Sequence, residues 1–230
     1  MSTGVPVSDI NWVCNAKPLD RVSAERVDAI KKYYETLNLR FWWWIYPCGH
    51  STETIKILRD KGLRLFAKVP CMAAQLNETL IDYKLTDEII ICPVTSKNDL
   101  LVWKDISFDG FEMPARAQDT YSAFVLSFNL DASSPQKLFL AYFDGKPVAT
   151  SLLFTHKNTA GIYYVSTLPA CRNRGFGQKI TQAAMQSAKE SGFKDVILQA
   201  TPMGERIYKK IGFEEYCQAE IYKLDKGLHL

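Results

Sequence analysis

Strand-like and helix-like stretches alternate along the second part of the chain, from residue 88 to residue 224. Runs of apolar, β-branched and aromatic residues are separated by stretches in which apolar residues return every three or four positions. The expected order is β-α-β-β-β-α-β-α-β, with residues 113–130 left unassigned. Such an alternation predicts an α/β domain in which helices cover a twisted sheet.

Turn and capping residues set the boundaries of these elements. A helix over 99–106 follows the first strand and is expected to be capped by Ser96, Asn98 or Asp99. Asp144-Gly145 joins two apolar runs and favours the positive φ angles of a tight hairpin turn. The strands are predicted over 88–94, 137–143, 147–154, 160–167, 195–200 and 214–224, and the later helices over 177–191 and 204–211.

The first part of the chain repeats the order of the last part. A helix (25–36), a strand (41–47), a short helix closing on Gly62 and a strand (64–76) parallel the helix, strand, helix and strand of 177–224. We therefore predict that Ile10 to Leu76 is a degenerate half-copy of the later fold. The expected domains are an N-terminal α/β half-domain over 1–80 and a second domain over 87–230. The alternative is that any two α-β-α-β stretches look alike.

The composition is that of a globular protein, with 47% hydrophobic and 23% charged residues. The formal charge of +3 is spread over 28 basic and 25 acidic side chains without a Lys/Arg run, so no nucleic-acid partner is expected. The N-terminus has no secretory pattern and no stretch approaches ~18 apolar residues, which predicts no membrane segment and a cytoplasmic location. Six cysteines lie far apart without C-x-x-C spacing, and are expected to be reduced thiols that bind no metal.

The strongest local pattern is a loop between a strand and a helix, with Pro169 followed by Arg172-Asn173-Arg174-Gly175-Phe176-Gly177. Glycines let backbone N–H groups approach a ligand, and the first turn of a helix offers unpaired donors with a partial positive charge. The pattern therefore predicts a pyrophosphate site. A dinucleotide-binding turn would need a third glycine where Ile180 stands, and a place at the first strand of a βαβ unit.

The loop and its surroundings resemble the GNAT superfamily of N-acyltransferases, whose hallmark is [Q/R]-x-x-G-x-[G/A] between the fourth strand and the third helix. The resemblance covers about residues 87–230 and includes Val165-Ser166-Thr167-Leu168-Pro169 ahead of the loop. It implies the GNAT fold, an α/β (α+β) domain with a mixed, mostly antiparallel twisted sheet flanked by helices. It also implies acetyl-CoA or another acyl-CoA as co-substrate.

The resemblance implies a set of cofactor contacts. In the family the strand before the loop splays from its neighbour, so that the backbone of Val165, Ser166 and Thr167 would contact the pantetheine arm. The loop would line the pyrophosphate, with Arg172, Asn173, Arg174, Gly175, Phe176, Gly177 and Gln178. Thr201 departs from the family pattern, because many relatives carry an asparagine at this position; it is kept as a candidate cofactor contact.

Tyr208 lies in a segment, residues 206–213, that is similar to the family's A-x-x-[L/F]-Y-x-x-x-G-F. Family members use this tyrosine as a general acid that protonates the departing CoA thiolate. A phenol with a pKa of ~10 is protonated at neutral pH and can donate to a thiolate of pKa ~8.5. The alternative is a helix tyrosine that only packs on the sheet.

No pattern singles out a general base. Glu112, Asp119 and Glu220 qualify by residue type alone, and residues of this type are more often solvated surface charges. His156 is interpreted as an exposed turn residue and Cys171 as incidental to direct acyl transfer.

The triplet Trp42-Trp43-Trp44 alternates faces in the expected strand, so at least one indole should leave the core. That ring would either help to form an acceptor pocket or pack against a helix.

The resemblance implies an N-acetyltransferase in which an amine of a small molecule or peptide attacks the thioester directly in a ternary complex. A monomer or a homodimer is expected. The rival interpretation is a non-catalytic acyl-CoA-binding sensor or scaffold with the same fold.

Overall fold

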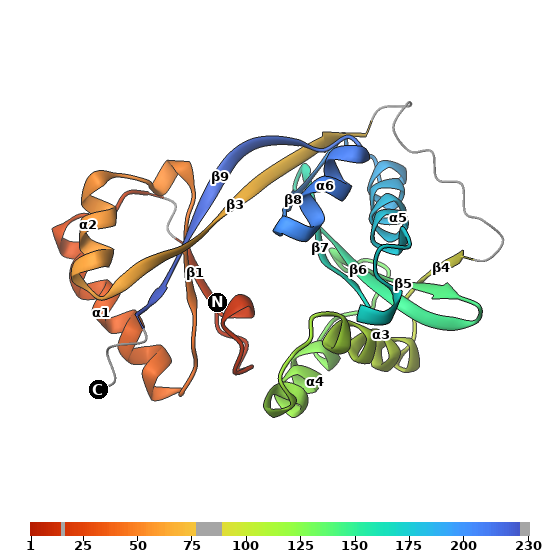
Figure 1. Ribbon diagram of the computed structural model, residues 1–230, viewed down its shortest axis with the longest axis horizontal. Coiled ribbons are helices and arrows are strands. Elements are labelled where there is room, and N and C mark those ends of the chain that lie inside the picture. Colours follow the sequence, from red (N-terminus) through yellow and green to blue (C-terminus); the bar gives the residue numbers. More distant parts are fainter. Residues whose placement is uncertain (15–16, 77–88, 226–230) are drawn as a thin grey trace. The chain divides into compact units, whose positions relative to one another are not determined.

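The fold is described from a computed structural model, which describes residues 1–14, 17–76 and 89–225. The chain forms two compact units (Figure 1). Unit 1 consists of Met1–Pro70 and Cys217–Leu230, and unit 2 of Cys71–Tyr216. None of the described helices has the length and apolarity needed to cross a membrane.

Unit 2 is built on a mixed, mostly antiparallel sheet with helices packed on it. Its strands follow the order β3-β8-β7-β6-β5-β4, in which only the β7–β8 pair is parallel. The strands are β3 (Leu63–Gln75, of which the end lies here), β4 (Ile89–Pro93), β5 (Gln136–Phe143), β6 (Lys146–His156), β7 (Thr159–Thr167) and β8 (Asp195–Gln199). The helices are α3 (Lys97–Gly110), α4 (Gln118–Leu126), α5 (Phe176–Glu190) and α6 (Pro202–Lys210), with 3-10 turns η3 (Ala115–Ala117) and η4 (Pro169–Cys171). The predicted fold class is confirmed.

In unit 1 the strands follow the order β1-β2-β9-β3. Strand β1 pairs with β2 in parallel, and β2 pairs with β9 in antiparallel fashion. Its elements are η1 (Ser8–Ile10), β1 (Trp12–Cys14), α1 (Arg21–Thr36), β2 (Trp42–Ile45), η2 (Pro47–Gly49), α2 (Thr52–Asp60) and the end of β9 (Glu214–Leu224).

Local sequence signals explain several element boundaries. Ser96 accepts a hydrogen bond from the backbone of Asp99, whose carboxylate accepts one from the Ser96 backbone, so a capping box begins α3. Asp144 and Gly145 both have positive φ angles, 50° and 69°, as the predicted hairpin between β5 and β6 requires. The segment 113–130, left unassigned by the sequence, contains η3 and α4, while Glu88 of the predicted first strand lies outside the described residues.

Each unit has a core between its helices and its sheet. In unit 2, α5 buries Ile180, Ala184 and Met185 against β-strand residues such as Leu153 and Val196. In unit 1, α1 and α2 cover the sheet, with buried residues Val27, Tyr34, Phe41, Trp43, Ile45, Ile57, Leu58, Leu63 and Tyr222. Burial of each large apolar side chain contributes roughly 1.5–3 kcal/mol, so both units have a hydrophobic core of their own.

In both units, one strand pairs with a strand that lies far away in the sequence. Cys71–Gln75 at the end of β3 pair with β8, and Glu220–Tyr222 near the end of β9 pair with β2. The order α1-β2-α2-β3 matches the order α5-β8-α6-β9, as the sequence predicts. Gly62 and Gly212, with φ of 80° and 93°, follow the short helices of the two halves. The half-repeat and the domain division at residues 80–87 stay predictions.

Candidate functional site

Strand β7 continues past the end of its ladder with β8. That ladder consists of two pairs, Ala160 with Val196 and Gly161 with Ile197. On its other side β7 pairs with β6 as far as Thr167, opposite Ala149. The edge of β7 that faces β8 is therefore open along its second half, which contains the predicted pantetheine contacts. The backbone of an open strand edge can pair with an extended ligand.

A β-bulge reshapes the same half of β7. The register with β6 shifts between Thr150, opposite Ser166, and Leu152, opposite Tyr163. Tyr164, in the bulge, has a φ of 51°, and its carbonyl oxygen accepts a hydrogen bond of 3.0 Å from the Thr150 hydroxyl. The hydroxyl oxygens of Thr150 and Ser166 lie 2.7 Å apart. The bulge therefore bends the strand where the site begins, and a short-range pattern gave no signal for it.

The predicted glycine loop leads directly into the N-terminus of α5. Asn173 and Gly175 have positive φ angles of 62° and 84°, and Gly175 is the N-cap, without a side-chain capping bond. A Cβ atom added to Gly175 would meet nothing within 4 Å, so glycine is required for its backbone angle rather than for space. The first-turn N–H groups of α5 have no intrahelical acceptor, and they add to the positive end of the helix dipole. This arrangement suits a phosphate group.

The loop side chains are held by the protein in different ways. The Arg172 guanidinium donates to the Thr167 carbonyl at 3.3 Å and to the Gly110 carbonyl at 2.9 Å, and forms an ion pair with Glu112 at 2.9 Å. The Arg174 guanidinium lies 4.4 Å from the centre of the Phe143 ring, a cation–π contact. Phe176 and Ser166 are buried, Val165, Thr167, Gly177 and Gln178 are half-buried, and Asn173 is exposed.

Tyr208 lies on α6 in a buried, apolar setting. The residue is 8% exposed, its ring centroid is 5.8 Å from that of Phe213, and burial raises the pKa of its phenol to about 12. The phenol therefore keeps its proton at neutral pH. The exposed Thr201 is the N-cap of the same helix, where its hydroxyl accepts a 3.2 Å hydrogen bond from the Gly204 backbone, so it has a structural role in α6.

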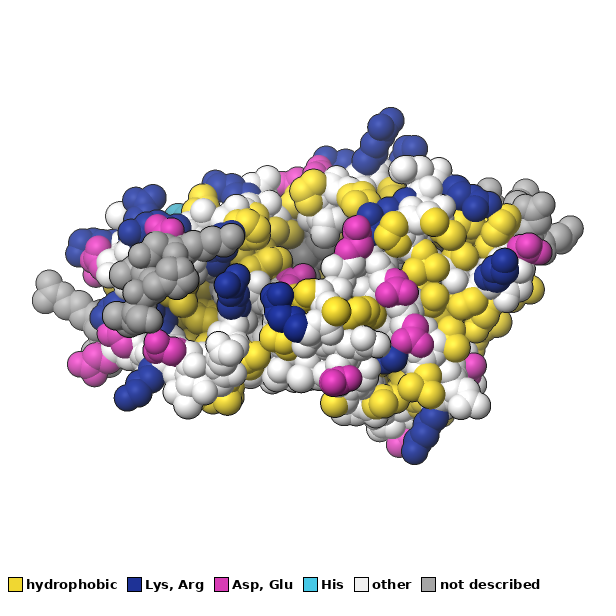
Figure 2. All heavy atoms as spheres, turned by 60° about the horizontal axis from the view of Figure 1, so that its bottom comes forward, with side chains coloured by type: hydrophobic (Ala, Val, Ile, Leu, Met, Phe, Trp, Pro, Cys, Tyr) yellow, Lys and Arg dark blue, Asp and Glu magenta, His cyan; other side chains and the backbone are white. Residues whose placement is uncertain are grey.

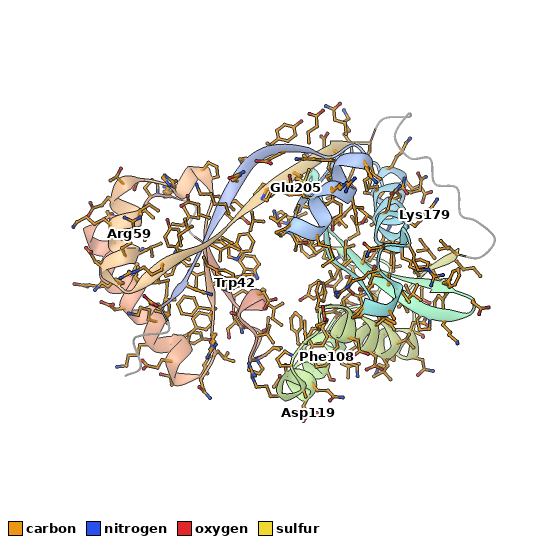
Figure 3. All side chains as sticks on the ribbon, in the orientation of Figure 1. Trp42, Arg59, Phe108, Asp119, Lys179 and Glu205 are labelled. Atoms are coloured by element: carbon orange, nitrogen blue, oxygen red, sulfur yellow. The ribbon has the colours of Figure 1, made fainter. Side chains whose placement is uncertain are left out.

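Two of the candidate bases lie in unit 2 and differ in their surroundings. Glu112, at the end of α3, is paired with Arg172. Asp119 lies in the first turn of α4 and is exposed (Figure 3). His156 is exposed, as predicted, but it is the last residue of β6 and pairs with Thr159, so it does not lie in the turn. Cys171 is half-buried against the core of unit 2.

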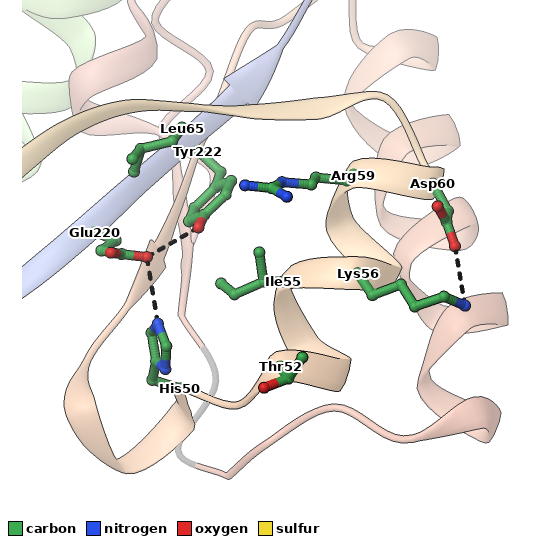
Figure 4. Close-up of a pocket in the computed structure, with 9 residues that line it drawn as sticks. All are labelled: His50, Thr52, Ile55, Lys56, Arg59, Asp60, Leu65, Glu220 and Tyr222. Carbon is green, nitrogen blue, oxygen red and sulfur yellow. Dashed lines mark hydrogen bonds and ion pairs between the residues drawn. The ribbon is translucent and has the colours of Figure 1, made fainter.

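The third candidate, Glu220, lies in unit 1 beside a cavity of about 590 Å³ between α2 and the sheet (Figure 4). Its side chain is 14% exposed and contacts Lys68 at 3.2 Å and His50 at 3.7 Å. The Tyr222 hydroxyl donates to it at 2.9 Å, and burial, then this bond, raise the pKa of Tyr222. The cluster joins three separate segments, so sequence spacing could not reveal it.

The tryptophan triplet alternates faces as predicted. Trp43 is 2% exposed in the core of unit 1, whereas Trp42 and Trp44 are half-buried with ring centroids 6.3 Å apart. The Nε1 atom of Trp44 is buried and has no hydrogen-bond partner among the described residues. An acceptor-binding role for these rings stays a prediction.

The described surface mixes charges of both signs. On the face drawn in Figure 2, Lys and Arg side chains are interspersed with Asp and Glu side chains and with hydrophobic ones. Among the described residues, no group of three or more His, Cys, Asp or Glu side chains could hold a metal ion.

Residues 134–215, which run from ahead of β5 to the start of β9, match the family model described as an acetyltransferase (GNAT) domain. About a third of the chain is therefore similar to a GNAT domain. This GNAT match includes the open half of β7, the glycine loop and Tyr208. Among curated proteins, none matches the sequence significantly.

Solved GNAT structures share the fold of this chain. A GCN5-related N-acetyltransferase from Kribbella flavida matches with a TM-score of 0.74 and 21% identity, covering 98% of this chain and 85% of that one. A GCN5-related N-acetyltransferase from Sphaerobacter thermophilus matches with a TM-score of 0.68 and 16% identity, covering 91% and 71%. A conserved protein of unknown function from Staphylococcus epidermidis matches with a TM-score of 0.66 and 16% identity, covering 91% and 83%. The likeness therefore extends over both units, although the family match lies in the second part of the chain.

Proposed function

We propose that the protein is an acyl-CoA-dependent N-acyltransferase that transfers an acetyl group to the amine of a small molecule or peptide. The observation that carries this proposal is the open edge of β7, which is followed through η4 and the glycine loop by an N-terminus of α5 that has no side-chain cap. An extended thiol arm fits the strand edge, and a pyrophosphate fits the helix terminus. The GNAT match over these residues supports the same assignment.

The site residues divide into two binding groups and one acid. The backbone of Val165, Ser166 and Thr167 would hold the pantetheine arm. The backbone of the loop would hold the pyrophosphate, over the residues Arg172, Asn173, Arg174, Gly175, Phe176, Gly177 and Gln178. Thr201 would lie at the cofactor edge of α6, although its hydroxyl already caps that helix.

The chemistry needs few protein groups. The co-substrate supplies the thioester, and the acceptor nitrogen attacks its carbonyl carbon. The carbon–sulfur bond then breaks, the acetyl group stays on nitrogen, and the sulfur leaves as a thiol. Tyr208 would donate the proton that the sulfur needs, since burial keeps its phenol protonated. Holding both reactants in one site supplies several further kcal/mol of barrier reduction.

None of the three candidate bases is assigned the role of general base. Glu112 is engaged by Arg172, Asp119 is exposed, and Glu220 is already bonded in unit 1. The amine proton therefore leaves to a base that this proposal does not name. We also propose that the protein is cytoplasmic and is a monomer or a homodimer.

The test is thiol release from acetyl-CoA in the presence of a panel of amines and amine-bearing peptides. Thiol release that depends on an amine, and that falls about 100-fold or more in Tyr208→Phe, supports the enzyme. The matched control is Tyr216→Phe, because Tyr216 is 69% exposed and lies outside the site. Tight CoA binding without turnover for any acceptor would refute the enzyme and favour the acyl-CoA-binding sensor or scaffold.

A further inference from the structure

The Arg172 side chain already contacts three groups of the protein itself. Its guanidinium reaches the carbonyl of Thr167 at the end of β7, the carbonyl of Gly110 at the end of α3, and the carboxylate of Glu112 just after α3. A guanidinium has five donors in a rigid planar fork, and this geometry binds several acceptors at once. Arg172 therefore bonds both to the nearby end of β7 and to a helix end that lies 62 residues before it in the sequence.

Glu112 occupies a backbone position that normally favours glycine. The backbone N–H of Glu112 donates to the carbonyl of Asp109 at 3.0 Å, and that of Met113 donates to the carbonyl of Phe108 at 3.1 Å. These two bonds form the Schellman motif that closes α3, in which the residue after the C-cap takes the left-handed conformation. Glu112 has a φ of 51°, which is strained for a residue with a side chain. The side chain at this strained position is the carboxylate that forms the ion pair with Arg172.

Gly110 brings the end of α3 into direct contact with the functional half of β7. A Cβ atom at Gly110 would lie 2.6 Å from the Ser166 hydroxyl oxygen and 3.4 Å from the Thr167 nitrogen. The helix end therefore packs closely against the Ser166 side chain and near the Thr167 backbone, with no room for a side chain at Gly110, and Arg172 bonds to both ends. The contact lies at the two residues whose backbone would hold the cofactor arm.

We propose that Arg172 is a positioning residue and not a phosphate ligand. Together with Glu112 it locks the end of α3 against Ser166 and Thr167, and the backbone N–H groups of the loop hold the pyrophosphate. A guanidinium that turned toward a phosphate would leave a carboxylate and a buried helix-end carbonyl without their donor. This inference rests on the proposed function and changes the role that the family pattern implies for one side chain.

The lock is tested first without any ligand, by hydrogen–deuterium exchange of the full chain. Arg172→Gln, Arg172→Lys and Glu112→Gln should each accelerate exchange of the backbone amides in 110–113 and 166–173. The double variant Arg172→Gln/Glu112→Gln should exchange no faster than Arg172→Gln alone, because that single variant already removes the contact with Glu112. The control is Glu190→Gln, which removes an exposed charge from the far end of α5. Unchanged exchange in Glu112→Gln, or additive effects, would overturn the lock.

The second measurement separates positioning from phosphate binding. CoA affinity is measured by calorimetry, and turnover by thiol release. For a positioning residue, the CoA dissociation constant stays within about twofold of the wild-type value in all three variants, while turnover falls about tenfold or more. A direct phosphate contact predicts the reverse. CoA binding would then weaken about tenfold in Arg172→Gln, less in Arg172→Lys, and would be unchanged or stronger in Glu112→Gln.

A third variant removes the backbone strain together with the carboxylate. Glu112→Gly should raise the melting temperature or leave it unchanged, yet accelerate exchange in 110–113 and 166–173 as Glu112→Gln does. Lys157→Gly is the matched control, because Lys157 is an exposed residue of unit 2 with the same φ of 51°. It should leave exchange in those segments unchanged. If the wild-type protein neither binds CoA nor releases thiol, the proposed function fails, and the exchange experiment still decides whether the lock exists.

Discussion

Replacing Gly204 by alanine would put a methyl group where the ring of Tyr208 lies. The new Cβ would stand 2.7 Å from Cε2, 3.2 Å from Cζ and 3.3 Å from the hydroxyl oxygen of Tyr208. Carbon atoms in contact lie about 3.5–4.0 Å apart, so the ring must move by roughly 1 Å. Phe213 packs against the same ring, which limits where it can go.

The substitution should cost more activity than stability. Overpacking costs about 1–3 kcal/mol, and alanine in place of glycine returns about 1 kcal/mol within a helix, so the net loss stays at about 2 kcal/mol or less. A displacement of about 1 Å at a reacting group can lower turnover by about 100-fold. We therefore expect Gly204→Ala to fold and to lose most of its thiol-releasing activity.

Thiol release and urea unfolding are compared for four proteins: wild type, Gly204→Ala, Tyr208→Phe and the double variant. If Gly204→Ala acts through Tyr208, the double variant will be no slower than Gly204→Ala alone. Met203→Ala is the control, since Met203 is 66% exposed on the same helix and should leave turnover unchanged. Wild-type turnover in Gly204→Ala, or a further large loss in the double variant, would refute the assignment of Tyr208 as the acid.

Gly175→Ala should destabilise the protein by about 1–2 kcal/mol in urea unfolding and weaken CoA binding, because a φ of 84° is unfavourable for alanine. The added Cβ meets no atom, so the backbone angle alone causes the loss. Stability and affinity equal to those of the wild type would contradict this. Trp43→Ala should cost about 3–5 kcal/mol in the same assay, because Trp43 is 2% exposed, whereas Trp42→Ala should cost less; equal losses would show that the assigned faces are wrong. The hydrogen bond from Ser96 lowers the pKa of Asp99, so its stabilising effect is present above the unfolded-state pKa and is lost as the pH falls through the folded-state value. Wild type should therefore lose more stability than Asp99→Asn between about pH 5 and pH 2 in acid titrations followed by circular dichroism, and parallel curves would count against the capping box.

Short-range rules explain which parts of the site could be read from the sequence. The loop from Arg172 to Gly177, the hairpin at Asp144 and the closure of α5 depend on φ preferences, caps and apolar periodicity, which act over a few residues. The same rules predicted the α/β class and the position of Tyr208 on a short helix. Burial of its phenol, which raises the pKa, came only from packing against the sheet and Phe213.

Contacts between distant segments explain what the sequence did not reveal. The bulge at Tyr164 depends on a hydroxyl from β6, and the cluster around Glu220 draws on three separate segments of unit 1. The pairings of β2 with β9 and of β3 with β8 also join residues that lie far apart in the chain. Such contacts follow from how the elements pack, and no local propensity encodes them.

The sequence by itself determined that a strand, a glycine loop and a helix follow one another in an order that suits an anion, because backbone angles and helix ends are local properties. Only the tertiary structure decided which groups the Arg172 side chain contacts. The acceptors of the Arg172 guanidinium lie at the end of α3, and they come within reach because Gly110 lets that helix rest on β7.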